Sequence, residues 1–179
     1  MQGDNRQHNR KHTSDGHFRV VHDLLSMSNE AVSKDAMRGK IVALEREMLK
    51  CQQVHIEPVH YFAKGLYARE ITIPKGCLLT GKIHLQEHIT MVLSGDISVN
   101  TDDGIRRIVA PAIFVTKPGM KRVGYAHEQT MFLTVHACEL TDVEKIEDAL
   151  VVDTFEQFER AIQDGAAIQC MLKDGGEAL

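Results

Sequence analysis

The sequence predicts a mainly β protein, with one β-barrel over residues 60–138, a helix before it and an acidic helical tail after it. Between residues 66 and 137, short segments of alternating apolar and polar residues are separated by turns rich in glycine and proline. Such spacing is typical of barrels and sandwiches, and no helix fits between the segments, which argues against a parallel α/β sheet. The expected strands are residues 66–73, 78–84, 88–94, 96–101, 105–109, 112–116 and 131–137.

The segment before the barrel, residues 21–59, is expected to contain a helix over residues 33–53. Met37, Ile41, Leu44 and Met48 recur at helical spacing and therefore fall on one face. Such a stripe indicates packing against the barrel or against a partner subunit. Residues 1–20 are polar and lack periodicity, which predicts a disordered arm.

The segment after the barrel, residues 139–179, again shows helical spacing. Thr141 and Asp153 each begin a stretch that resembles the capped start of a helix. Residues 139–164 contain nine acidic residues against Lys145 and Arg160. These acids fit either a solvated helix face or an acidic tail that binds a partner.

The composition argues against several functional classes. The formal net charge of -4 gives no general field for nucleic acid, so we do not expect nucleic-acid binding. The four cysteines form no CxxC pair, which argues against a zinc knuckle or a redox motif. Because neither a run of about 18 apolar residues nor an apolar signal peptide occurs, we expect a soluble, cytoplasmic protein without a membrane span.

The segment most suggestive of chemistry is residues 81–96. Lys82, His84 and His88 have the same parity, so an unbroken strand would present them on one face. The two histidines would then stand about 13 Å apart along the strand, too far to share a metal ion. They can meet only if the chain bends near Leu85–Glu87.

This segment resembles the first motif of the cupin superfamily, in which HxH is followed by Glu and then by Gly. Counting back from Gly95 places His88 at the glutamate position, His84 at the second histidine and Lys82 at the first. The stretch from Ala110 to Gly119 is similar to the second motif, with Arg122 at the expected histidine. The resemblance covers roughly residues 65–137 and implies an RmlC-like jelly-roll barrel with a central pocket.

The resemblance also implies a divalent transition metal (Fe, Mn, Ni or Zn) held by histidine and glutamate. Lys82 and Arg122 cannot coordinate a metal when charged, so His84 and His88 need other ligands. The candidate ligands are Glu87 and His136, with His127, His60 and Tyr67 as alternatives.

The two basic substitutions also suggest a different use of the pocket. Arginine pairs well with carboxylate and phosphate, so a positive pocket predicts a small anionic ligand, nucleotide-like or a sugar phosphate. The residues expected to bind it are Lys82, His84, His88, Arg122, Arg69 and Tyr125, with Lys121 nearby.

Residues 67–70, 79–84 and 118–127 also resemble uncharacterised cupin-type proteins of tailed phages and prophages. This second resemblance implies a phage-related origin, hence the host cytoplasm, but no activity. Three hypotheses follow: a cupin that binds a small molecule, a metal-dependent cupin enzyme (dioxygenase, isomerase or hydrolase), and a non-catalytic structural or interaction protein of a phage. In each case we expect a homo-oligomer, a dimer.

Overall fold

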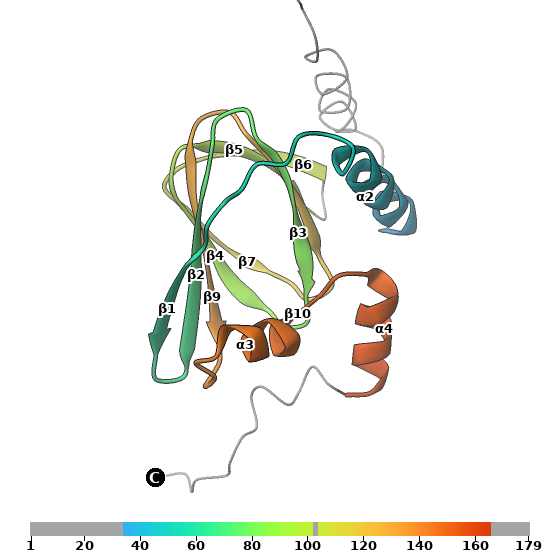
Figure 1. The fold of residues 1–179 in the computed structure, drawn as a ribbon, viewed down its shortest axis with the longest axis vertical. Coiled ribbons are helices and arrows are strands. Elements are labelled where there is room, and N and C mark those ends of the chain that lie inside the picture. The colour runs from blue at the N-terminus through green and yellow to red at the C-terminus, as the bar shows by residue number, and fades with distance from the viewer. Residues whose placement is uncertain (1–33, 102–103, 166–179) are drawn as a thin grey trace, which may run out of the picture.

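The computed structural model describes residues 34–101 and 104–165, and the expected arm at residues 1–20 lies outside them. Two five-stranded antiparallel sheets face each other, and helices lie at one side and one end (Figure 1). The strand order is β1-β2-β9-β4-β7 in the first sheet and β10-β3-β8-β5-β6 in the second. The elements are α2 (Lys34–Met48), β1 (Val59–Ala63), β2 (Leu66–Ile73), β3 (Leu78–His84), β4 (His88–Ser94), β5 (Asp96–Thr101), β6 (Gly104–Val109), β7 (Ala112–Thr116), β8 (Lys121–Ala126), β9 (Thr130–Ala137), α3 (Val143–Leu150), β10 (Val151–Val152) and α4 (Phe155–Gln163).

The chain crosses between the two sheets at most of its turns, which makes the barrel a jelly roll. From β2 to β5 the strands alternate between the sheets, and from β6 to β9 they alternate again. The alternating apolar residues of both sheets meet in a common core that includes Ile73, Val92, Ile97 and Val99. The mainly β fold class predicted from the sequence is confirmed.

Three strands, β1, β8 and β10, were not predicted from the sequence, each for a local reason. Segment β1 follows Pro58 directly, and its residues are mostly exposed rather than alternating. Strand β8 reads KRVGYA, in which Lys121, Arg122 and Gly124 hide the apolar alternation. Strand β10 has only two residues and pairs with β3, opposite His84 and Ile83.

Helix α2 packs its apolar stripe against the outside of the second sheet. Of the two expected arrangements, this is packing against the barrel. Ile41 and Leu44 are buried against Val123, and Met37 and Met48 flank them. The helix ends at Met48, earlier than expected.

The described part of the segment after the barrel, residues 139–165, packs against the barrel through α3 and β10. Asp142 caps α3 by accepting hydrogen bonds from two backbone N–H groups, and Thr154 forms a capping box with Gln157 at α4. Ile146 and Leu150 of α3 are buried beside Tyr67. In the described part of the chain, no helix combines the length and the apolarity needed to cross a membrane.

The turn from β4 to β5 requires a glycine. Gly95 has φ of +91°, and a Cβ atom there would lie 2.3 Å from the carbonyl oxygen of Gln129. Gly39, inside α2, has no heavy atom within 4 Å of the same position. The two glycines therefore respond oppositely to an added methyl group.

We expect Gly95→Ala to lower the free energy of unfolding by about 2 kcal/mol or more, because a positive φ and a backbone clash oppose the new side chain. Gly39→Ala should raise it by about 0.5–1 kcal/mol, since alanine loses less backbone entropy in a helix. Urea denaturation of both variants measures the two effects. Equal effects, or effects of the same sign, would contradict this account of the turn.

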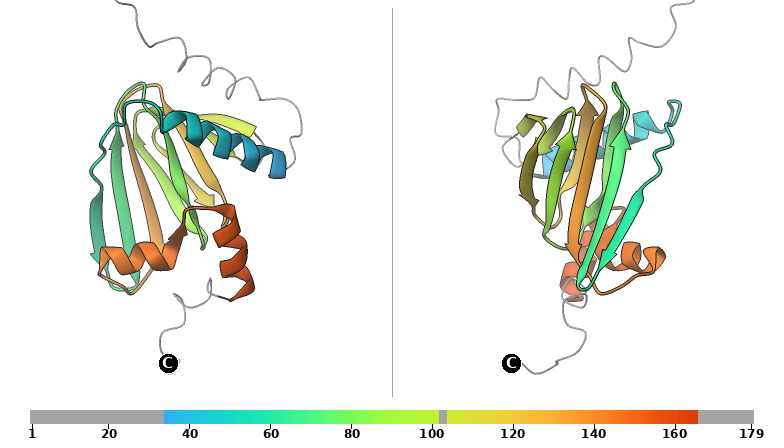
Figure 2. Two further views of the ribbon diagram at one scale, coloured as in Figure 1. Left: turned by 45° about the vertical axis from the view of Figure 1, so that its right-hand side comes forward. Right: turned by 90° about the vertical axis from the view of Figure 1, so that its left-hand side faces the viewer.

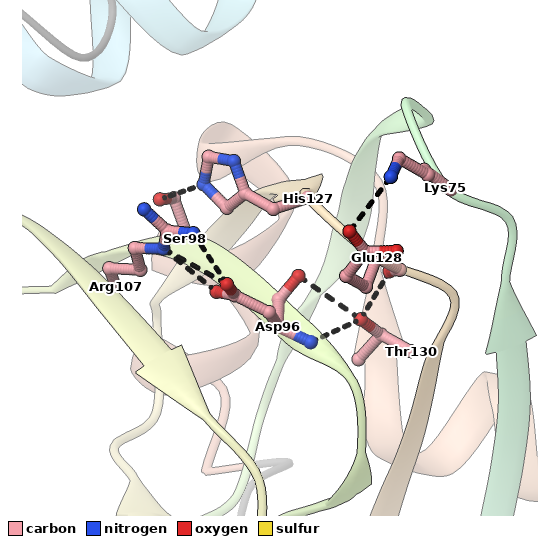
Figure 3. Close-up of polar contacts among 7 residues, drawn as sticks. All are labelled: Lys75, Asp96, Ser98, Arg107, His127, Glu128 and Thr130. Carbon is pink, nitrogen blue, oxygen red and sulfur yellow. Dashed lines mark hydrogen bonds and ion pairs between the residues drawn. The ribbon is translucent and has the colours of Figure 1, made fainter.

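Polar contacts hold the start of β5 to its neighbours (Figure 3). The Arg107 guanidinium donates to both carboxylate oxygens of Asp96, at 2.6–3.1 Å. This bond holds the pKa of Asp96 below its ordinary value of 3.8. The Thr130 hydroxyl also contacts the backbone N–H and C=O of Asp96, and Ser98 Oγ lies 2.7 Å from His127 Nε2.

We predict that Arg107→Gln raises the pKa of Asp96 toward 3.8. Because the folded-state pKa is the lower one, the pair stabilises the protein above about pH 4, and this contribution is lost as the pH falls through the folded value. The carboxyl carbon shift of Asp96, followed by NMR against pH, measures the change. Lys75→Gln removes the neighbouring exposed ion pair with Glu128 and should leave the Asp96 titration unchanged.

Candidate metal and ligand site

The bend between β3 and β4 brings two histidines together. His84 ends β3 in one sheet, His88 begins β4 in the other, and the chain bends at Leu85 and Gln86 between them. The Leu85 N–H donates to the carbonyl of Leu150 at 2.8 Å, and the Gly119 N–H donates to the carbonyl of His84 at 2.9 Å. The imidazole centroids of His84 and His88 lie 4.1 Å apart, as the expected bend required.

His136 of β9 completes a cluster with these two residues. Its ring centroid lies 5.0 Å from that of His84 and 4.5 Å from that of His88. One ring nitrogen from each residue of this histidine cluster (His84, His88 and His136) lies within 4.8 Å of the others. Nitrogen atoms that share an ion at about 2.1 Å lie at most about 4.2 Å apart, a difference that small ring rotations close.

Burial keeps the histidine cluster neutral. It lowers the pKa of His84 well below the ordinary value of 6.5, that of His88 to about 4 and that of His136 to about 3. For His84 and His136, the other cationic groups nearby, including Arg69, add to this effect. Neutral imidazole is the form that binds a metal.

Two buried nitrogen atoms of the cluster lack a partner. His84 Nδ1 and His136 Nδ1 form no hydrogen bond with any residue that the structure describes. Leaving such an atom unsatisfied costs about 1–3 kcal/mol, so a buried pair of this kind favours a site that is completed by a metal or ligand. The donor set therefore fits a divalent transition metal that accepts imidazole.

The cluster lines one end of a cavity of about 330 Å³ inside the barrel. The register between β2 and β9 arranges its wall in layers, with Tyr67 opposite His136, Arg69 opposite Thr134, and Ile71 opposite Phe132. The exposed side chains of Lys82 and Glu147 lie at the rim on the histidine side.

The middle layer of the wall is cationic and rich in hydroxyl groups. Arg69 Nε is buried without a hydrogen-bond partner, and no carboxylate of the described residues forms an ion pair with Arg69. Arg122 donates to Thr116 Oγ1 at 2.9 Å and to the carbonyl of Asn100. Thr116 Oγ1 in turn lies 2.8 Å from Thr90 Oγ1. The side chains of Arg69 and Arg122 line the part of the cavity next to the histidine cluster.

The far layer of the wall is apolar. Ile71 and Phe132 line it from the first sheet, and Leu79, Ile97 and Val99 line it from the second. All five belong to the main core cluster or pack against it. The cavity is therefore polar and cationic at one end and apolar at the other.

Four of the expected ligand-binding residues line the cavity, together with Lys82, which is already paired. His84, His88, Arg69 and Arg122 point into it. Lys82 Nζ lies at the rim, 3.2 Å from Glu147 Oε2 and 3.7 Å from Asp153 Oδ1. The Lys82 ammonium, which was expected to bind the ligand, is thus already paired with the carboxylates of Glu147 and Asp153.

Tyr125 and Lys121 do not line the cavity, because they have the opposite parity to Arg122 and Gly124 on β8. Tyr125 contacts His127 edge-on, with ring centroids 5.0 Å apart. Lys121 forms an ion pair with Glu45 of α2 at 3.0 Å. The expectation that these two side chains face the ligand is therefore corrected.

Four of the expected or alternative metal ligands lie outside the histidine cluster. Glu87 is in the bend but exposed, and the cluster includes no carboxylate among the described residues. His127 contacts Ser98 in the Asp96 network (Figure 3). His60 Nδ1 lies 2.7 Å from the hydroxyl of Tyr67, the alternative ligand whose ring lies next to His136.

The hydroxyl groups of Thr90 and Thr116 and the helix α3, which complete the site, were not predicted from the sequence. Thr90 and Thr116 look like ordinary strand residues, and only the pairing of β4 with β7 places them side by side. Ile146, Glu147 and Leu150 of α3 close one end of the cavity. The apolar spacing of α3 was visible in the sequence, but its partner surface was not.

No family model and no curated protein matches the chain. Among solved structures it is similar to an RmlC-like cupin from Shewanella frigidimarina, with 21% identity over 46% of this chain and 82% of that one, at a TM-score of 0.39. It is also similar to a cupin superfamily protein from Desulfitobacterium hafniense (8% identity, 49% and 81%, TM-score 0.41) and to KdgF from Halomonas sp. (17%, 52% and 90%, 0.43). The two-sheet topology described above is a jelly roll.

Proposed function

We propose that this protein is a cupin that binds a divalent transition metal through His84, His88 and His136 and a small anionic ligand beside it. The observation that carries the proposal is the convergence of three neutral imidazoles, two of them buried and that of His84 half-buried, on the wall of a cavity inside the barrel. Buried residues of this type in a concave site are the usual mark of a binding or catalytic centre.

The histidines would hold the metal, and a set of imidazole ligands suits Fe, Ni or Zn better than Mn, which prefers oxygen ligands. When bound, such an ion acts as a Lewis acid toward an oxygen of the ligand. Three protein ligands leave coordination positions open, as a catalytic metal requires. The bend at Leu85 fixes the orientation of the first two rings, and the β2–β9 pairing fixes the third.

The anion would bind to the arginines. The Arg69 guanidinium is half-buried, its Nε lacks a hydrogen-bond partner, and no carboxylate of the described residues forms an ion pair with it, so an anionic ligand would supply the missing charge. Arg122 is held in place by Thr116 and Asn100, so little side-chain entropy is lost when a ligand binds. The phage-related origin and the cytoplasmic location stay predictions from the sequence.

Untagged protein loaded with Zn²⁺ or Ni²⁺ and dialysed should retain about one equivalent of metal, measured by plasma mass spectrometry. His84→Ala and His136→Ala should each lower the retained metal at least tenfold, because two ligands of three remain. His55→Ala is the matched control, since His55 is exposed and pairs with Glu57 away from the cavity. Retention of a full equivalent by both cluster variants, with circular dichroism confirming their fold, would contradict the assignment.

A further inference from the structure

Resting on the proposed function, we infer that the anionic ligand is a small carboxylic acid with an apolar chain. The carboxylate would pair with Arg69, and the chain would extend into the apolar layer of the cavity. In the pairing of β2 with β9, the Arg69–Thr134 pair lies between the Tyr67–His136 pair and the Ile71–Phe132 pair. Arg69 therefore stands between the histidine cluster and the apolar layer.

The carboxylate is favoured over a phosphate by the charge that the cavity offers. Arg69 Nε is buried without a partner, while the Lys82 ammonium is already paired with Glu147 and Asp153. A planar carboxylate accepts two parallel hydrogen bonds from the Arg69 guanidinium alone. The Arg122 guanidinium already donates to Thr116 and Asn100, whereas a phosphate dianion needs more than one available cation to leave water.

The apolar layer of the cavity determines which groups the ligand can carry beyond its carboxylate. A sugar or nucleotide would leave hydroxyl or amide groups unpaired against Ile71, Leu79 and Phe132, at a cost for each group. An alkyl or aryl chain leaves none, and it gains from burial there. The volume of about 330 Å³ lies at the small end of ligand pockets.

The test is calorimetric titration of the metal-loaded and the chelator-treated protein with straight-chain alkanoates from propanoate to octanoate. Affinity should rise roughly fourfold per methylene until the chain fills the cavity, as for ordinary apolar burial. Primary amides of the same chain length should bind at least tenfold more weakly. Arg69→Gln should remove that preference while the protein still retains metal, whereas Arg106→Gln, at an exposed position on β6, should change neither property.

The outcomes separate this inference from the metal site. Alkanoate binding that needs Arg69 but not metal supports the inference and counts against the metal site. Metal retention with no binding of any alkanoate, or with alkyl phosphates bound more tightly than alkanoates, overturns the inference and leaves the metal site standing. Equal affinity for amides and alkanoates overturns it as well.

A second observation concerns the outer face of the first sheet. The outward positions of β4 and β7 include Ile89, Leu93, Ile113 and Val115, which are 41–70% exposed. Within the five strands, Glu70 is the one charged residue at an outward position. Figure 2, in its right view, looks onto this side of the barrel, and no described helix crosses it.

We propose that a second copy of this chain covers this face. Five strands about 4.8 Å apart and five to eight residues long span about 500 Å² before side-chain relief is counted, which approaches the roughly 800 Å² per partner of a stable interface. A face with so little charge gives no basis for selecting a charged partner, whereas an identical apolar face complements it.

Light scattering at micromolar concentration should give twice the mass of the chain. Ile113→Lys should halve that mass, because each copy would bury an unpaired lysine ammonium in the apolar interface. Val109→Lys is the matched control, since Val109 is 65% exposed but belongs to the second sheet, and it should leave the dimer intact. A monomeric wild type, or a dimer that Ile113→Lys preserves, overturns the proposal.

Discussion

The candidate site depends on one bend in the chain. His84 and His88 are four residues apart, a spacing that keeps two side chains about 13 Å apart on a straight strand. The bend at Leu85 and Gln86 moves the chain from one sheet to the other, so that the two rings lie 4.1 Å apart at one end of the cavity. Two backbone hydrogen bonds, from Leu85 to Leu150 and from Gly119 to His84, hold the bend. Helix α3 and strand β10 are thus part of the site's scaffold.

Much of the fold could be predicted from the sequence because its signals are local. The seven expected strands have apolar alternation and glycine or proline turns, and each is present. The stripe of Met37, Ile41, Leu44 and Met48 identified the buried face of α2. Strand β8 was not predicted because its side chains have three different environments. Val123 packs against α2, Lys121 forms an ion pair with Glu45, and Arg122 lines the cavity. No single periodicity describes such a strand.

The site was only partly predictable, since it depends on pairings between distant strands. His84, His88 and His136 were each candidates, but only the tertiary structure brings them together. Parity along β8 separates Arg122 from Tyr125, and this distinction needs the strand to be recognised first. Lys82 has the parity of a pocket residue, yet Glu147 and Asp153, which were assigned to a solvated tail, neutralise it. Charge in a sequence does not reveal which charges are already paired.

The two parts of the proposed function support each other electrostatically. Arg69 and Arg122 disfavour protonation of the histidine cluster, which keeps the imidazoles in the ligand form, but the same positive field also opposes a divalent cation. An anion on Arg69 cancels part of that field at the place where the metal would bind. Metal and anion should therefore bind with positive coupling, and by linkage each must raise the affinity of the other by the same factor. A neutral ligand of the same shape would give no such coupling, so the charge on Arg69 connects the two sites.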